Sequence, residues 1–338
     1  MGLYAIATHS HLVIVDFDPN WRIQDYQLLS TGYHFGLALQ MVGDALHLVA
    51  YRGGAGVYQQ TEQQLRTYRV GRPCELVSVQ PLQENWGDVH QIAWANGGIY
   101  SANTQFNQVV YQNAQLTQTY AFEDQHQDWN HLNSVYPCGR QVFVMLHNRG
   151  RMESQLAVLE HEAVGFRLQQ QISLWDRGCH NLFVSDPDLY YNASHAHSVV
   201  LADARRNRIM HRLTFEGWHT KGMSVTPEVI VAGLSEYTLR DRRAFSRCQL
   251  AVIERSSGSV RQVVDLSLPD YAQNLGNINE LRSLSGDELG QAGPEPVALD
   301  WSQVRLAQAH PWRYHLRYWQ TRLLAPLRHT KRYLRERI

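Results

Sequence analysis

The chain has 338 residues, of which 44% are hydrophobic and 18% charged, and its 31 basic residues balance its 31 acidic ones. These proportions are typical of a soluble globular protein, and no apolar run approaches the roughly 18 residues that a membrane-spanning helix needs. An integral helical membrane protein is therefore excluded, and the balanced charge gives no reason to expect a nucleic-acid partner.

The first residues and the cysteines bear on the compartment. Residues 1–9 lack the basic and long apolar regions of a secretory signal peptide. The four cysteines are far apart and form no C-x-x-C pair, which favours reduced thiols over disulfides or a zinc ribbon. We expect a cytoplasmic protein.

The first elements form part of a repeating pattern. Residues 3–17 read as a strand, a short polar turn and a second strand. Five further hairpins follow, and a histidine stands at or just before the start of each. These are His34, His90, His131, His180 and His219. Their spacing of roughly 40 to 55 residues is typical of four-stranded propeller blades.

The hairpin in residues 128–148 shows the pattern best. A polar segment with His131 leads into a short strand, and a Pro-Cys-Gly turn at 137–139 reverses the chain. The apolar strand 142–146 then returns and ends at a second histidine, His147. This unit, repeated, predicts an all-β fold.

We expect a six-bladed β-propeller over residues 1–285. Five blades are predicted at 31–78, 79–124, 125–174, 175–215 and 216–268, and the sixth is shared between 1–30 and 269–285. The strand-like segment 277–284 would pair with the N-terminal strands, close the ring and remove its open edges. Residues 286–310 read as a linker.

The last segment, 311–338, is predicted to be a basic amphipathic helix. From Pro311 onward it has eight basic residues and one acid, and its apolar stripe includes Trp312, Leu316, Trp319 and Leu323. Such a helix can pack on the propeller, bind an anionic membrane surface or dock on an acidic partner. Packing on the oppositely charged body is favoured, and peripheral membrane contact is the next alternative.

The five hairpin histidines are the strongest functional signal. If the hairpins are blades, these side chains converge on one end of the central axis, and neutral imidazole is a good ligand for divalent metals. We expect His90, His131 and His180 to bind a divalent metal, with His34 and His219 as flanking catalytic residues. Asp88 and Asp128 would orient the ligands.

Two interpretations of these histidines remain open. The alternative to a metal site is that each histidine only satisfies buried backbone groups between blades. Five more histidines lie near strand ends and are expected to be surface residues for the most part: His9, His11, His147, His195 and His197.

Arginines supply a second candidate element. The segment 234–243 carries Arg240 and Arg242, whose forked guanidinium groups suit a carboxylate, sulfate or phosphate of a substrate. A solvated, self-paired loop is the competing interpretation. Lysine is rare, with only Lys221 and Lys331 present, and this scarcity argues against covalent lysine chemistry.

Short motifs suggest a resemblance. The sequence has no G-x-S-x-G elbow and no P-loop. Its hairpin histidines, Gly233-Leu-Ser235 with downstream arginines and Asn277-Ile-Asn-Glu-Leu281 resemble an uncharacterised family of propeller-like conserved hypothetical proteins over about residues 30–285. Residues 128–135 are similar to the histidine blade of bacterial arylsulfotransferases, and a histidine-lined axis resembles metal-binding propeller lyases. The family resemblance implies a fold without a reaction, and the two enzyme similarities are analogies.

The sequence thus favours a metal-dependent enzyme that acts on a small molecule or peptide at a histidine-lined axial channel. The metal would polarise a carbonyl or activate water. The alternative is a non-enzymatic propeller that binds a partner through its loops and uses its histidines structurally.

Overall fold

The structure is a computed structural model, and it describes residues 2–53, 63–82, 86–122, 128–185 and 187–286 together with residues 288, 301 and 304. The predicted helix at 311–338 lies outside the described residues. Within the described part of the chain, no helix is long and apolar enough to span a membrane.

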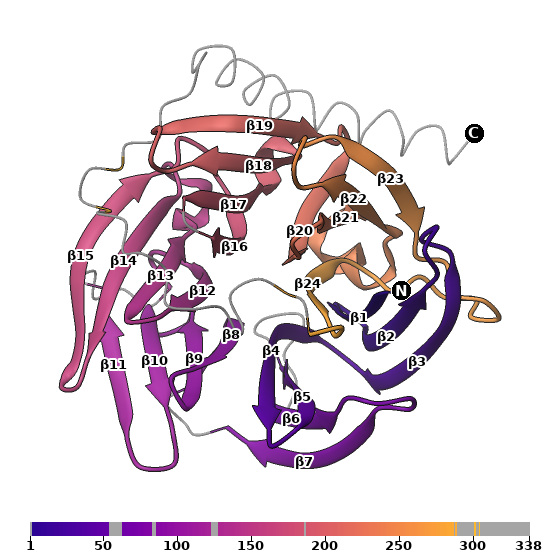
Figure 1. The fold of residues 1–338 in the computed structure, drawn as a ribbon, viewed down its shortest axis with the longest axis horizontal. Coiled ribbons are helices and arrows are strands. Elements are labelled where there is room, and N and C mark those ends of the chain that lie inside the picture. Colours follow the sequence, from indigo (N-terminus) through magenta and orange to yellow (C-terminus); the bar gives the residue numbers. More distant parts are fainter. Residues whose placement is uncertain are drawn as a thin grey trace.

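Six four-stranded antiparallel sheets are arranged around a central axis (Figure 1). The first two sheets in the chain contain β1 (Gly2–Thr8), β2 (His11–Phe17) and β3 (Ile23–Thr31), then β4 (His34–Val42), β5 (Ala45–Arg52), β6 (Gln64–Arg69) and β7 (Glu75–Pro81). The next two contain β8 (Val89–Ala95), β9 (Gly98–Asn103), β10 (Gln108–Gln112) and β11 (Thr117–Ala121), then β12 (Leu132–Cys138), β13 (Gln141–Leu146), β14 (Gln155–Glu162) and β15 (Gly165–Ser173).

The last two complete sheets contain β16 (Cys179–Ser185), β17 (Asp188–Ala193), β18 (Ser198–Asp203) and β19 (Arg208–Thr214), then β20 (Trp218–Val225), β21 (Val229–Glu236), β22 (Cys248–Glu254) and β23 (Val260–Asp265). Short 3-10 helices follow three second strands: η2 (Asn148–Gly150), η3 (Ser194–Ala196) and η4 (Arg240–Phe245). The predicted six-bladed all-β propeller is confirmed, and only small shifts of the blade limits are needed, such as β7 ending at Pro81.

The ring closes as predicted. The last strand, β24 (Ile278–Ser283), pairs antiparallel with β1, with Tyr4 opposite Ser283 and Ala5 opposite Arg282. All six residues of β24 are buried. The C-terminal strand thus becomes the innermost strand of the N-terminal blade, and the circle has no unpaired inner edge.

Burial changes from the axis to the rim. The innermost strand β24 is buried along its whole length, whereas the rim strand β7 is exposed at six of seven positions. Strands packed on both faces are continuously apolar, and rim strands need only one apolar face. This difference explains why the inner strands were the clearest signal in the sequence.

A feature absent from the sequence prediction is a β-bulge in the innermost strand of each blade. The pairing register shifts between His34 and Leu37, Val89 and Gln91, Leu132 and Ser134, His180 and Leu182, Thr220 and Met223, and, opposite β1, between Ile278 and Glu280. A bulge leaves residues unpaired and re-aims their side chains. The residues inserted in β8 and β20 include His90 and Lys221.

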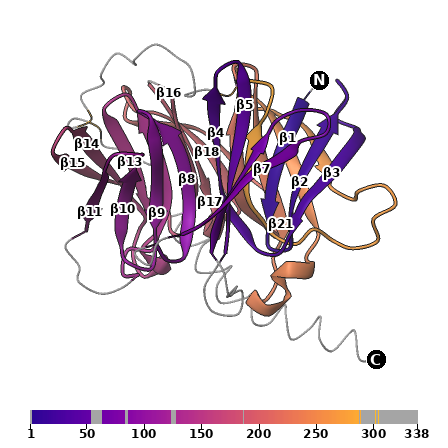
Figure 2. The same cartoon turned by 90° about the horizontal axis from the view of Figure 1, so that it is seen from below.

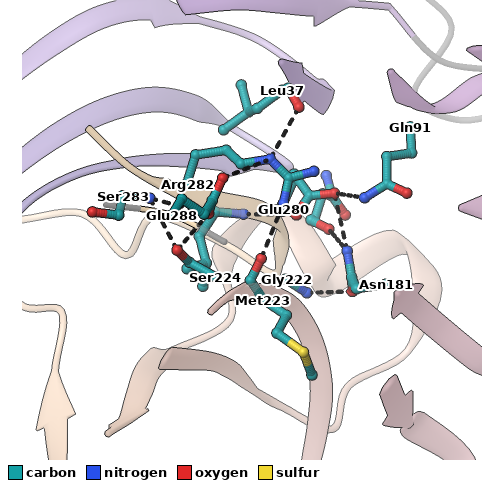
Figure 3. A network of polar contacts seen from close by, with 12 residues as sticks. Leu37, Gln91, Asn181, Gly222, Met223, Ser224, Glu280, Arg282, Ser283 and Glu288 are labelled. Atoms are coloured by element: carbon teal, nitrogen blue, oxygen red, sulfur yellow. Dashed lines mark hydrogen bonds and ion pairs between the residues drawn. The ribbon is translucent and has the colours of Figure 1, made fainter. Parts of the chain in front are cut away.

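A buried ion network fills the axis next to these bulges (Figure 3). Arg282 lies 3.4 Å from Glu280 and 3.8 Å from Glu288, and its guanidinium donates to the carbonyl oxygens of Leu37 and Met223. Glu280 accepts hydrogen bonds from Gln91 and Asn181. Gln91 in turn accepts from the backbone N–H of Val135, so the inner strands of all six blades take part. We call these residues the axial ion network.

Parts of the predicted linker lie against the propeller. Glu288 is buried in the axial ion network, where burial raises the pKa of its carboxyl to about 7. Trp301 is also buried, and its ring lies 4.8 Å from that of Phe143 on β13. These two described residues of segment 286–310 therefore contribute to the core.

Candidate functional site

The inner strands begin on the face of the propeller that also carries η4, the short coil below β21 in Figure 2. On this face, aromatic side chains from every blade follow one another around the axis. Successive ring centroids lie 4.1–5.6 Å apart in the order His9, Tyr33, Phe35, His90, His131, His147, His180 and His219. His195 lies 5.7 Å from His147. We call these histidines, with Lys221, the axial histidine cluster.

The bonds of Nδ1 define the tautomer of three histidines. His90 Nδ1 lies 2.9 Å from the carbonyl oxygen of Asp88, and His180 Nδ1 lies 3.0 Å from that of Gly178. A carbonyl oxygen can only accept, so the proton must be on Nδ1. His131 Nδ1 lies 2.6 Å from the Asp128 carboxylate, which favours the same tautomer. In each of the three rings, Nε2 is therefore left with its lone pair.

A hydroxyl group strengthens this arrangement in two blades. Thr104 Oγ1 lies 2.8 Å from His90 Nδ1, and Ser194 Oγ lies 2.8 Å from His180 Nδ1. Each hydroxyl donates its own proton to the backbone of the next blade, Thr104 to Leu132 and Ser194 to Thr220. The hydroxyl oxygen is thus an acceptor for the imidazole N–H. The same hydrogen-bond arrangement occurs in two blades, so we regard it as part of the repeat.

Burial keeps these imidazoles neutral. It lowers the pKa of His131 to about 4 and the pKa of His90, His147, His180 and His219 well below the usual value, and neighbouring histidines and Lys221 act in the same direction. Neutral imidazoles with a free lone pair can accept a proton or bind a cation. The arrangement is therefore suited to base catalysis or to ligation.

Lys221 extends into the middle of this cluster. Its Nζ lies 3.8 Å from the centroid of the Phe35 ring. Phe35 belongs to β4, the innermost strand of another blade. Burial lowers the pKa of its amine, and the Arg243 and Arg240 guanidiniums lower it further, whereas Asp88 and Glu280 raise it. The face of the Phe35 ring favours the charged amine. Desolvation by burial is the largest influence, so the pKa of Lys221 is lowered well below its usual value.

His34 does not join the cluster. Its backbone carbonyl accepts a bond from Asn279, its Nδ1 bonds the carbonyl of Gly32, and the charged groups that act on it are Arg52, Arg66 and His11. Burial lowers its pKa to about 3. Phe35 contacts His90 instead, because the bulge in β4 begins directly after His34.

The second group of histidines was expected mainly at the surface, yet His9 and His147 are buried members of the cluster. His197 is also buried, and its Nδ1 bonds the Trp218 carbonyl, whereas His11 bonds the Tyr271 hydroxyl outside the cluster. These positions follow the ends of strands, and only ring closure shows which of them lie near the axis.

The arginine segment forms η4, and its residues differ in their relation to the cluster. The positive charge of Arg240 lowers the pKa of four groups in the cluster, so it lies near them. These are His9, His90, His131 and Lys221. Arg243 acts on His9, His219 and Lys221. Arg240 and Arg242 are exposed and Arg243 is partly buried. The predicted role of Arg242 in holding an anionic group stays a prediction, and Arg243 is a further candidate for it.

A metal ion would need three ligand atoms directed at one point. Among the residues that the structure describes, no three His, Cys, Asp or Glu side chains are grouped in that way. His90, His131 and His180 are not mutual neighbours, since His147 lies between His131 and His180. In this conformation the predicted ligand set does not fit a metal ion.

A cavity of about 470 Å³ lies elsewhere, between the blade of β1 and that of β20, with Tyr4, Trp21, Pro227 and Arg261 among its lining residues. Its lining includes Gly2 and Ser283, at the ends of β1 and β24 opposite the axial histidine cluster. Among the described residues that line this cavity there is no histidine or cysteine. The axial histidine cluster is therefore the better candidate site.

Comparisons with known proteins show the fold and no family. No protein-family model matches the sequence, and no curated protein matches it. A chain from a nidogen/laminin complex is similar in structure, with a TM-score of 0.61 and 8% identity over 84% of this chain and 98% of that one. A protein of unknown function from Bacteroides caccae has a TM-score of 0.51 and 13% identity over 84% and 99% of the two chains. A putative 6-phosphogluconolactonase from Bacteroides fragilis has a TM-score of 0.51 and 10% identity over 83% and 97%. The chain is a six-bladed β-propeller with distant structural neighbours.

Proposed function

We propose that the protein is an enzyme that acts on a small molecule with an anionic group at the axial histidine cluster. The observation that supports this proposal is the gathering of neutral imidazoles and Lys221 around one axis, with Arg240 and Arg243 nearby. Convergent polar groups with perturbed pKa values are typical of active sites.

The chemistry follows from the side chains. His90, His131 and His180 can each take a proton at Nε2, because Nδ1 already carries one. Arg240 and Arg243 supply positive charge for a carboxylate or phosphate of the substrate. The nearby acid Asp128 is engaged by His131 and Arg149.

Anion binding tests the proposal. Titration of the protein with oxalate by calorimetry near pH 7 is expected to show saturable binding. Substitution of Arg240→Gln with Arg243→Gln is expected to weaken it at least about tenfold, because each charge-assisted bond contributes about 1.5–3 kcal/mol. Arg242→Gln, in the same 3-10 helix, is the matched control and should leave binding unchanged. Equal losses in the two variants, or no binding of oxalate or phosphate, would contradict the proposal.

A divalent metal in the same cluster is the second candidate. The fixed Nδ1–H groups of His131 and His180 favour it, since they direct the Nε2 lone pairs away from the protein backbone as in known histidine ligands. His131, His147 and His180 would have to turn toward one another to hold the ion. Elemental analysis of protein purified without an affinity tag is expected to show near-stoichiometric metal that falls in His147→Gln. Metal-free protein that takes up no zinc on addition would remove this candidate.

The rival class is a binding platform with structural histidines, and it predicts neither oxalate binding nor metal. Peripheral membrane contact through 311–338 also remains a proposal. Sedimentation with anionic vesicles at low salt, lost in a chain that ends near Pro294, is the expected result if that segment is an anchor.

A further inference from the structure

Lys221 is held in place by the backbone around it. It lies in the bulge of β20, and the next residue, Gly222, has a positive φ of 81°. The Gly222 N–H donates to the Asn181 side chain at 2.6 Å, which links β20 to the neighbouring blade. A side chain at Gly233 would lie 2.2 Å from the Lys221 carbonyl oxygen, so β21 also fits closely against this position. The lysine therefore projects from a fixed point.

The amine is surrounded by neutral imidazoles, two arginines and two acids. The charged and titratable groups that interact with it include Arg240 and Arg243 from η4, Asp88 before β8, Glu280 from β24, and the histidines His9, His90, His131, His147, His180 and His219. Glu280 is engaged by Gln91, Asn181 and Arg282. Within the described part of the chain, none of the ion pairs or hydrogen bonds of the structure involves Lys221 Nζ.

A structural role would favour a different arrangement. A buried lysine that only stabilises the fold normally forms an ion pair with a carboxylate or donates to carbonyl oxygens. Lys221 is 7% exposed, and its Nζ lies over the face of Phe35. A desolvated lysine beside other cations is the usual setting of a nucleophilic amine.

We propose that Lys221 is a nucleophile that forms an imine with the carbonyl carbon of a small 2-oxo acid. The inference rests on the proposed function, because Arg240 and Arg243 would hold the carboxylate of that substrate. The Nζ lone pair forms the N–C bond while the carbonyl π pair moves to oxygen. An imidazole Nε2 of the cluster takes a proton from nitrogen and returns it to oxygen. Loss of water then gives the C=N bond, and no oxidant or reductant is consumed.

Reductive trapping tests this inference. The full-length protein is incubated with pyruvate and sodium cyanoborohydride near pH 6.5, digested and analysed by mass spectrometry. We expect Lys221 to gain the carboxyethyl group at least about tenfold faster than Lys331, because an ordinary lysine is almost fully protonated at that pH. The chain has only these two lysines, so Lys331 is an internal comparison. Lys221→Arg removes the primary amine and should lose the labelled peptide while the protein stays folded.

Two control reactions separate the outcomes. Formaldehyde carries no anionic group, so its labelling of Lys221 should persist in the Arg240→Gln and Arg243→Gln double variant while pyruvate labelling falls. Labelling of Lys221 no faster than Lys331 by either reagent would overturn the inference, and oxalate binding would still support the proposed function. Labelling by formaldehyde alone would overturn the 2-oxo acid assignment, and together with absent oxalate binding it would also overturn the proposed function.

Discussion

The protein is expected to unfold as the pH falls from about 6 to 4, because protonation of its buried histidines is much less favourable in the folded state than in the unfolded chain. Burial lowers the pKa of eight of them: His9, His11, His34, His90, His131, His147, His180 and His219. In the unfolded chain each takes up a proton below about pH 6.5. The unfolded state then binds more protons than the folded state, so the free energy of unfolding decreases as the pH falls.

Together the histidines lower the free energy of unfolding substantially as the pH falls. Each such histidine costs about 1.4 kcal/mol of stability for every pH unit below its unfolded pKa, until its folded pKa is reached. That limit is about pH 4 for His131 and about pH 3 for His34. The total stability of a domain is about 5–15 kcal/mol. Glu288, with its raised pKa of about 7, acts in the opposite direction between about pH 7 and 4.5. The pKa of Glu280 is raised too, but these are two groups against eight histidines.

Urea denaturation at a series of pH values, followed by tryptophan fluorescence, measures this dependence. His34→Asn is the informative variant, because an amide N–H can keep the bond to the Gly32 carbonyl without titrating. Its unfolding midpoint should move to lower pH, whereas His47→Asn, a change at a partly exposed position on β5, should not move it. Equal stability of the parent protein at pH 7.5 and pH 4.5 would show that the histidines are protonated in the folded state.

Replacement of Arg282 is expected to be the most destabilising single substitution in the axial ion network. Arg282→Met removes the cation between Glu280 and Glu288 and leaves both carboxyl groups buried. Breaking a buried ion pair in this way costs about 3–5 kcal/mol. The Leu37 and Met223 carbonyl oxygens would also lose their donor, which adds to the loss.

Chemical denaturation near pH 7.5 measures this loss. Arg261→Met is the matched control, because Arg261 pairs with Glu254 at 2.6 Å on the exposed rim, where a pair contributes about 0–1 kcal/mol. Adding Glu288→Gln to Arg282→Met should recover part of the stability, since one uncompensated acid is removed. A change in Arg282→Met no larger than in Arg261→Met would show that the network does not support the ring.

The fold could be predicted because each blade has a recognisable local sequence pattern. Turns, apolar inner strands and a leading histidine recur along the chain, and residues 277–284 lacked any other partner than the N-terminal strands. The candidate site was only partly predictable. His90, His131, His180 and His219 converge, but the bulge in β4 exchanges His34 for Phe35, and bulges leave little trace in a sequence.

Lys221 and Arg282 could not have been identified from the sequence. Scarcity of lysine says nothing about where a single lysine lies, and Lys221 stands only two residues after His219 without any motif. The axial ion network joins residues of β8, β16 and β24 that are far apart in sequence. Contacts of this kind join residues that are far apart in sequence, and no local sequence pattern specifies them.

Binding of an anionic ligand by the axial histidine cluster can be tested directly. Diffraction from a crystal of the protein soaked in selenate, whose selenium scatters anomalously, locates such a ligand. We expect an anomalous peak among the cluster histidines, within reach of Lys221 and Arg243, that disappears in the Arg240→Gln and Arg243→Gln double variant. A peak that persists in that variant, or peaks found only on the outer surface of the blades, would contradict anion binding by the cluster.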